Sequence, residues 1–105
     1  MSTYQTVREL ARELPDVEES TSYGTPALKV KKKLLVRLKE DGTTLVLRVS
    51  FDRRDILMQA EPETFFITDH YLGYPAVLAK LPRLGRKQLR DLLRMSWQFV
   101  TGKSL

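Results

Sequence analysis

Apolar and polar positions change their period along this chain, and the changes divide it into helices and strands. Near the N-terminus, apolar residues recur at helical spacing at Val7, Leu10, Ala11 and Leu14. Pro15 then ends this helix, because proline disfavours the helical conformation of the residue before it. Between residues 17 and 49 the period falls to two, which predicts strands.

The alternating region is divided by turns into antiparallel strands. Residues 18–23 form a polar strand typical of a sheet edge, and the runs 28–30, 34–38 and 44–49 alternate apolar with charged residues. Asp41-Gly42 is a strong hairpin-turn sequence. Short turns require antiparallel pairing, because a parallel pair needs a long crossover.

The second half of the chain predicts two helices around two further strands. Asp52 can cap a short helix that runs to Ala60, with Ile56 and Leu57 directed inward. Residues 65–67 and 76–81 are strand-like and flank the loop that contains His70. The last predicted helix spans residues 86–100, and its inward face comprises Leu89, Leu92, Leu93, Trp97 and Val100.

This order of elements predicts one α+β domain over residues 1–105, because it has neither a repeat nor a linker. The elements follow the order α-β(3-4)-α-β(2)-α. We therefore expect two layers, an antiparallel sheet with its helices packed on one face. We also expect Trp97 to be largely buried.

Alternation along the strands predicts what the other face of the sheet displays. If Leu34, Val36 and Leu38 point toward the helices, Leu35 and Arg37 point away from them. The same parity places four cations outward, Lys29, Arg37, Arg48 and Lys80, together with three aliphatic residues, Leu35, Val46 and Leu78. A solvated face explains the cations, whereas exposed aliphatic residues indicate a partner.

Composition excludes several classes of function. The chain has no cysteine and one histidine, which excludes disulfides, thiolate catalysis and multi-histidine metal sites. Residues 1–13 lack the apolar run of a signal peptide, and no segment approaches the roughly 20 apolar residues that cross a bilayer. We expect a cytoplasmic protein without a metal, a cofactor or a membrane partner.

The net charge of +5 and the pI near 9.7 favour a polyanionic partner, and two segments carry the cations that bear on it. The first, which we call the lysine hairpin, comprises Lys29, Lys31, Lys32 and Lys33 at a strand junction. The second, the arginine ridge, comprises Arg86, Arg90 and Arg94 at helical spacing on the last helix. Each segment is compatible with phosphate contacts and equally with a solvated surface.

The His70 loop is the third candidate site. His70, Tyr71 and Tyr74 lie within five residues beside Gly73 and Pro75. They could line a small-ligand pocket, or the tyrosines could simply pack while the glycine and proline turn the chain. Catalysis needs several converging groups. No nucleophile or phosphate-binding glycine motif accompanies this histidine, so we expect no enzyme.

Three stretches of the chain resemble one protein family. They are SYGTPALKV at 22–30, RDILMQAEPETFF at 54–66 and HYLGYPAVL at 70–78. They are similar to the MmcQ/YjbR family of small DNA-binding-type proteins, whose HYxGYPxVL pattern the third stretch matches. The resemblance implies a two-layer fold likened to secretion chaperones and described as double-winged. Family members usually have glycine where this chain has Lys31-Lys32, which implies a less tight turn with exposed charge at its tip.

Together these patterns predict a non-enzymatic binding protein. Nucleic acid is the leading ligand, bound weakly and largely non-specifically through phosphate contacts of the lysine hairpin and Arg37, with the arginine ridge secondary. One alternative is a protein-interaction module that uses the open sheet face, with an acidic partner and a monomer or weak homodimer. The other is a small-ligand site at His70, Tyr71 and Tyr74.

Overall fold

The computed structural model describes residues 2–105, which form three α-helices and a six-stranded sheet. The helices are α1 (Tyr4–Ala11), α2 (Phe51–Ala60) and α3 (Arg86–Thr101). The strands are β1 (Val17–Ser22), β2 (Thr25–Val30), β3 (Lys33–Leu38), β4 (Thr44–Arg48), β5 (Phe65–Phe66) and β6 (Ala76–Lys80). Two 3₁₀ turns, η1 (Asp69–Tyr71) and η2 (Leu81–Arg83), flank β6.

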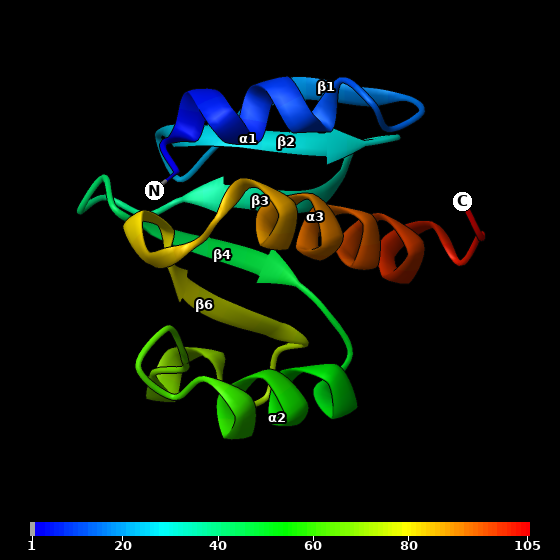
Figure 1. Ribbon diagram of the computed structural model, residues 1–105. Coiled ribbons are helices and arrows are strands. Elements are labelled where there is room, and N and C mark those ends of the chain that lie inside the picture. Colours follow the sequence, from blue (N-terminus) through cyan, green and yellow to red (C-terminus); the bar gives the residue numbers. More distant parts are fainter. Residues whose placement is uncertain (1) are drawn as a thin grey trace.

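All neighbouring strands pair antiparallel, in the order β1-β2-β3-β4-β6-β5. Helices α1 and α3 lie against the same face of the sheet, and α2 lies at the β5–β6 end (Figure 1). The chain therefore has the α+β architecture and the order of elements that its sequence predicts. The face away from α1 and α3 is called the opposite face below.

The main hydrophobic core lies between the sheet and the helices α1 and α3. Leu10 and Leu93 bring the apolar stripes of the two helices onto strand residues such as Leu47. Trp97 is 5% exposed, which confirms the expected burial, and its indole N–H donates to the carbonyl of Pro15 at 2.9 Å. The helical periodicity of both terminal helices thus identified this face correctly.

A bulge in β3 changes the parity that simple alternation predicts. Lys29 pairs with Leu34 but Leu28 pairs with Val36, so Leu35 is an extra residue on its strand. Leu35 and Val36 are consequently both part of the main core. The expectation that Leu35 points away from the helices is wrong, and so is the inward placement of Leu34, which lines a groove on the opposite face.

The opposite face is partly covered, so the expected aliphatic patch is not exposed. Val46 and Leu78 do lie on this face, but each is 1% exposed because both belong to a second buried cluster with Tyr71 and Ala76. Tyr71 comes from the segment between β5 and β6, which thereby covers this part of the face. The prediction of three exposed aliphatic residues therefore fails at all three positions.

Helix α2 differs from its prediction in cap and in orientation. Ser50, not Asp52, is the N-cap, and its hydroxyl accepts a hydrogen bond from the Arg53 amide. Ile56 is 60% exposed, whereas Arg54 is buried. The expected inward position of Ile56 is wrong, because α2 turns a charged side chain, rather than an aliphatic one, toward the opposite-face loop.

Candidate nucleic-acid interface

The lysine hairpin is a tight two-residue turn between β2 and β3. Val30 pairs with Lys33, which leaves only Lys31 and Lys32 between the strands. Their φ angles are 50° and 69°, the positive values that a type I′ turn requires at both central positions. The expectation of a less tight turn is therefore wrong. The twist of the strands selects this turn even though neither residue is glycine.

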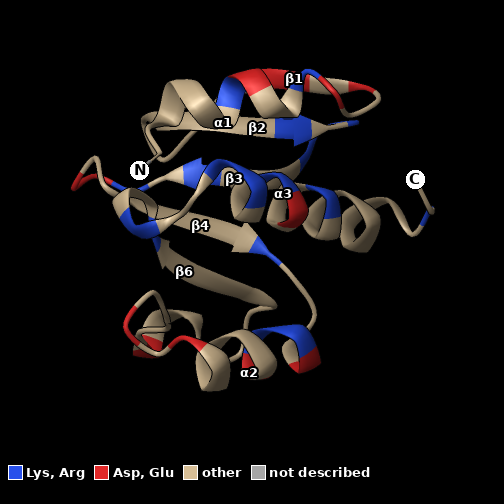
Figure 2. Cartoon of the chain, in the orientation of Figure 1, with Lys and Arg blue, Asp and Glu red and all other residues tan. Residues whose placement is uncertain are grey.

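The charge at this hairpin is exposed and free of ion pairs. Lys31, Lys32 and Lys33 are exposed and Lys29 is half-buried. Within residues 2–105, none of these four ammonium groups lies in an ion pair. Figure 2 shows the blue of the lysines running from the end of β2 into the turn. Lys31 and Lys33 also line a hollow of about 200 Å³ together with Lys103.

The arginine ridge on α3 has a different environment. Arg86 pairs with Glu9 at 3.2 Å, and Arg90 pairs with Glu13 at 3.2 Å. Both glutamates belong to the α1 region, which packs beside α3. These ion pairs offset the two positive charges that the sequence predicted to contact phosphate. Most of the ridge therefore joins α3 to the α1 region.

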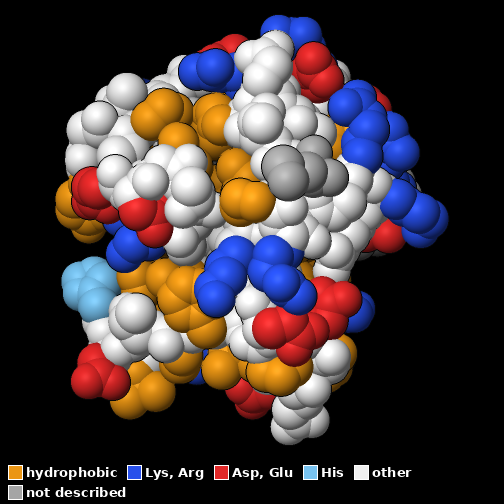
Figure 3. All heavy atoms as spheres, turned by 60° about the vertical axis from the view of Figure 1, so that its left-hand side comes forward, with side chains coloured by type: hydrophobic (Ala, Val, Ile, Leu, Met, Phe, Trp, Pro, Cys, Tyr) orange, Lys and Arg blue, Asp and Glu red, His pale blue; other side chains and the backbone are white. Residues whose placement is uncertain are grey.

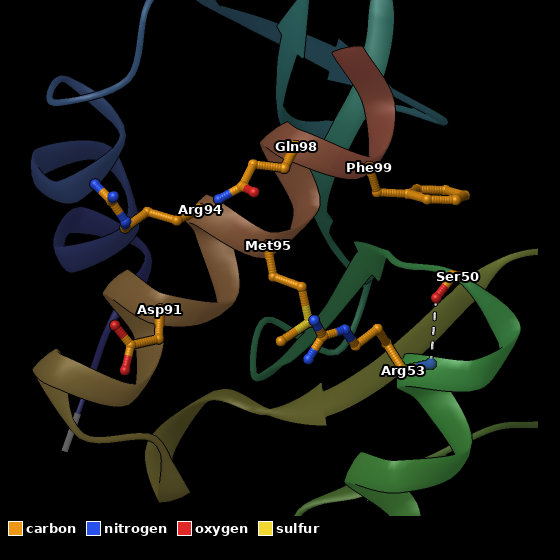
Figure 4. Close-up of a pocket in the computed structure, with 7 residues that line it drawn as sticks. All are labelled: Ser50, Arg53, Asp91, Arg94, Met95, Gln98 and Phe99. Carbon is orange, nitrogen blue, oxygen red and sulfur yellow. Dashed lines mark hydrogen bonds between the residues drawn. The ribbon is translucent and has the colours of Figure 1, made fainter. Parts of the chain in front are cut away.

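Arg94 is the member of the ridge that forms no ion pair within the described part of the chain and lines a cleft. The cleft, about 400 Å³ in volume, separates α3 from the start of α2. Figure 4 shows Arg53 reaching across from α2 toward Met95, with Arg94 and Gln98 on α3 above it. The cleft is thus lined by two cations, and only Arg94 among them was a candidate from sequence.

Arg37 is not available as a surface cation, because it is 5% exposed. Its guanidinium donates to the hydroxyls of Thr25 at 3.1 Å and Tyr71 at 3.4 Å, and it lies 3.5 Å from the Glu40 carboxylate. It also stacks over the Tyr23 ring at 5.1 Å. The expected outward phosphate contact of Arg37 does not agree with this burial.

The His70 loop is held in place by Arg54 of α2. The Arg54 guanidinium donates to the carbonyls of Tyr71 and Tyr74 at 3.0 Å, of Leu72 at 3.1 Å and of Ala76 at 3.4 Å. One charged group thereby satisfies the carbonyls of a loop that has little regular structure. Sequence reasoning missed this residue. Its signals in the sequence were its place at the start of the family-like stretch 54–66 and a charge one turn before Leu57, which was expected to face inward.

The loop brings His70, Tyr71 and Tyr74 together, as the sequence suggested for a ligand site. The ring centroids of His70 and Tyr71 are 4.9 Å apart, and those of Tyr71 and Tyr74 are 6.3 Å apart. They line one side of a groove of about 390 Å³ on the opposite face, which we call the tyrosine groove. Its lining residues are Ser22, Tyr23, Leu34, Arg37, Val46, His70, Tyr71 and Tyr74.

The tyrosine groove contains residues that sequence reasoning did not select. Tyr23 comes from the β1–β2 turn, 82% exposed, and Leu34 comes from β3 because of the bulge. The strands themselves carry no aromatic side chain into this groove, so its rings come from the two loops that flank it. In Figure 3 the histidine, in pale blue, lies beside orange hydrophobic side chains.

Nowhere in residues 2–105 do three or more His, Asp or Glu side chains group as metal ligands would. Over the same residues, no helix combines the length and apolarity needed to span a membrane. The lysine hairpin presents ammonium groups that form no ion pair within the described residues. The tyrosine groove presents aromatic rings around an apolar floor.

The fold and these surfaces define a small α+β protein with a six-stranded antiparallel sheet. The YjbR family model matches residues 12–99, so the chain belongs to the YjbR family. The crystal structure of Deinococcus radiodurans protein DR2400, which carries a DUF419 domain, is similar with a TM-score of 0.83 and 28% identity. The match covers 98% of this chain and 81% of that one.

Curated relatives come from mycobacteria. Uncharacterized protein Rv2570 of Mycobacterium tuberculosis and uncharacterized protein Mb2600 of Mycobacterium bovis are each 31% identical over 84 residues. Each match covers 76% of this chain and 65% of the relative, so the chain spans less than two thirds of their length.

Proposed function

We propose that this protein is a non-enzymatic nucleic-acid-binding protein that contacts phosphates through the lysine hairpin. The observation that carries the proposal is the conformation of Lys31 and Lys32, with φ angles of 50° and 69°. A left-handed conformation costs a residue with a Cβ roughly 1–2 kcal/mol. Glycine or asparagine would form the same turn with less strain. Retaining two lysines there is consistent with a role for their charge.

The electrostatic surroundings support the hairpin over the arginine ridge. Arg86 and Arg90 are already paired with glutamates, and a phosphate would have to compete with those carboxylates. The lysines at the turn form no ion pair within the described residues, although the Asp16 carboxylate lines the same hollow as Lys31 and Lys33. Lys29 differs from them, because it lies directly opposite the acidic residue Glu18 on β1. We therefore assign the main contacts to Lys31, Lys32 and Lys33.

Phosphate-driven binding has a quantitative signature in its salt dependence. Each neutralised phosphate releases counterions and contributes about −0.9 to the slope of log affinity against log salt for duplex DNA. Three to five contacts predict a slope of roughly −3 to −4.5. Such binding does not discriminate base sequence, because lysines that reach only phosphate carry no base readout.

The test is a salt-titrated binding assay with duplex DNA, single-stranded DNA and heparin. We expect the Lys31→Gln, Lys32→Gln, Lys33→Gln variant to bind all sequences more weakly and with a flatter slope. A matched control, Arg86→Gln, Lys87→Gln, Arg90→Gln, removes the same charge from α3 and should retain the wild-type slope. An effect of the control alone would move the contact to α3. Absence of binding at low salt would remove the proposal.

Heparin decides whether the binding depends on nucleic acid or only on negative charge. Equal affinity for heparin and DNA would reduce the hairpin to a general polyanion site. A protein-interaction role for the open sheet face loses the observation that suggested it, since its three aliphatic residues, Leu35, Val46 and Leu78, are at most 1% exposed.

A further inference from the structure

The tyrosine groove on the opposite face reaches the lysine hairpin at Lys29. Leu34, which lines the groove, follows Lys33 in the chain and pairs with Lys29 across the β2–β3 ladder. Leu34 and Lys29 therefore project from the same side of neighbouring strands. Lys31 and Lys33 line a hollow beside Trp97 on the helix side, so Lys29 is the hairpin cation on the side of the groove.

Tyr23 occupies a strained position at the mouth of the groove. Ser22 pairs with Thr25, so Tyr23 and Gly24 form a two-residue turn, with φ angles of 55° and 79°. Glycine and asparagine are the usual residues at the first of these positions. Tyrosine is an outlier there, and its side chain is 82% exposed. The ring contacts the Arg37 guanidinium, 5.1 Å from its centroid, but is otherwise exposed, and a strained residue that exposes an aromatic ring suggests a role in contacting a ligand.

The far wall of the groove is fixed in place before any ligand arrives. Tyr71 is 6% exposed, and Arg54 binds its backbone carbonyl and that of Tyr74 at 3.0 Å each. Because the loop is tied to α2 by several charged hydrogen bonds, little conformational freedom remains to be lost on binding. The rings of the loop thus face Tyr23 across a defined gap.

The floor is apolar and the cation within the groove is immobilised. Leu34 and Val46 supply aliphatic surface. The Arg37 guanidinium lies 5.1 Å from the Tyr23 ring centroid and is held by Thr25 and Tyr71. A second hollow of about 290 Å³ continues past Arg37 and His70 and is lined by Lys39 and by Glu40, whose carboxylate pairs with Arg37. The site combines flat aromatic surface and an apolar floor with the Lys39 ammonium at one end.

We propose that the tyrosine groove binds an unpaired nucleobase, stacked on Tyr23 over the floor of Leu34 and Val46, with its phosphate toward Lys39 or Lys29. The groove volume of about 390 Å³ lies within the range of small-molecule sites. Stacking on aromatic side chains tolerates any base, because every base has a π face. This inference rests on the proposed nucleic-acid binding and adds a preference for single strands to it.

The same base-plus-phosphate chemistry is found in a free mononucleotide and in a single-stranded oligonucleotide. The experiment therefore compares three probes: oligothymidylate, an abasic oligonucleotide of equal length, and thymidine monophosphate. The proteins are the wild type, Tyr23→Asn and the control Phe99→Gln. Asparagine tolerates the left-handed turn while removing the ring, and Phe99 is a partly exposed aromatic residue outside the groove.

We expect the wild type to bind oligothymidylate about tenfold more tightly than the abasic strand, as one stacked base predicts. Tyr23→Asn should bring the two affinities together without changing the salt slope, and Phe99→Gln should change neither. Equal wild-type affinities for the two strands, or an undiminished preference in Tyr23→Asn, would overturn the groove inference. A preference that only Phe99→Gln abolishes would also overturn it.

The two proposals fail in different ways. If base preference persists in the Lys31→Gln, Lys32→Gln, Lys33→Gln variant while the salt slope is unchanged, the hairpin proposal fails and the groove inference stands. If that variant has a flatter salt slope but the wild type has no base preference, the hairpin proposal stands and the groove inference fails. Monophosphate binding that Tyr23→Asn abolishes supports the groove and identifies a free nucleotide as a sufficient ligand.

Discussion

The two faces of the sheet are closed in different ways. One face is covered by α1 and α3, whose apolar stripes meet the strands in a continuous core that includes Leu10, Leu93 and Trp97. The other is covered only over β4 and β6, by a loop whose position depends on hydrogen bonds from Arg54. The remainder of that face contains the tyrosine groove.

This difference separates the structural residues from those available for binding. On the helix side, charges at the surface are paired between elements, as Arg86 is with Glu9. Among residues 2–105, four non-glycine residues have a positive φ: Lys31, Lys32 and Tyr23 lie in the two turns that flank β2, and Asp16 lies beside Trp97. Burial and ion pairing thus describe the helix-covered face, while most of the strained positions lie in exposed turns at the ends of β2. The following predictions test that contrast.

Truncation of Trp97 should have the largest effect on stability. Trp97→Ala removes a side chain that is 5% exposed and that donates to Pro15, and losing a buried tryptophan costs about 3–5 kcal/mol of unfolding free energy. Urea denaturation monitored by circular dichroism measures the change. Phe99→Ala on the same helix, 37% exposed, is the control with a much smaller expected cost. Equal costs would contradict the assignment of the helix face.

Removing the Arg54 clamp should cost less than the loss of Trp97 and act on the other face. Arg54→Met keeps much of the side-chain volume but leaves the loop carbonyls without their donor, so we expect a loss of about 2–3 kcal/mol. Hydrogen exchange should accelerate for the amides of residues 71–76. Arg53→Met is the matched control, because Arg53 is an exposed neighbour and such changes usually stay within about 0.5 kcal/mol.

Relieving the hairpin strain should stabilise the protein. In the Lys31→Asn, Lys32→Gly variant both positions accept a positive φ, so we expect a gain of about 1–2 kcal/mol in unfolding free energy. The Lys31→Gln, Lys32→Gln variant removes the same charges but keeps the strain and should leave stability unchanged. A gain in both variants would attribute the effect to charge repulsion instead of backbone conformation.

The smallest effect concerns Tyr4 on the helix-covered side. Burial raises the pKa of Tyr4 to about 12 from 10, with the nearby Arg8 charge opposing the rise. Tyr4 would ionise in the unfolded chain near pH 10 while it stays protonated in the folded one. The folded state then binds more protons, so stability should decline as the pH rises from 10 toward 12.

Comparison with Tyr4→Phe isolates this contribution, since lysines also titrate in the same range. The wild type should lose more unfolding free energy than the variant between about pH 9 and about pH 11. Parallel pH profiles would mean that the Tyr4 hydroxyl is hydrated when folded. Its oxygen has no hydrogen-bond partner within residues 2–105.

Much of the fold could be predicted because its signals are local. The helical spacing of Val7, Leu10 and Leu14 and of Leu89, Leu93 and Trp97 identified α1 and α3 together with their buried faces. Alternation and turn residues identified the strands. The family resemblance carried by His70 to Leu78 agrees with the family model that matches residues 12–99.

The errors arise where one residue shifts a register or one element covers another. Because Leu35 is an extra residue in β3, Leu34 faces the side of the sheet opposite to the one predicted, and no local signal in the sequence marks this bulge. Ser50 and Asp52 are both acceptable helix caps, and which side of α2 is buried depends on the loop carbonyls that Arg54 binds, which lie 17 to 22 residues away in the chain. Burial of Val46 and Leu78 depends on a loop that is distant in sequence.

What the sequence by itself determined is the class of fold, the two terminal helix faces and the position of the lysines at a turn, because periodicity and turn chemistry act between residues close along the chain. Only the tertiary structure decided which cations are free, since Glu9 lies 77 residues from Arg86 and yet pairs with it. It also created the tyrosine groove, because Tyr23 and His70 meet only when a sheet edge and a crossing loop are folded together.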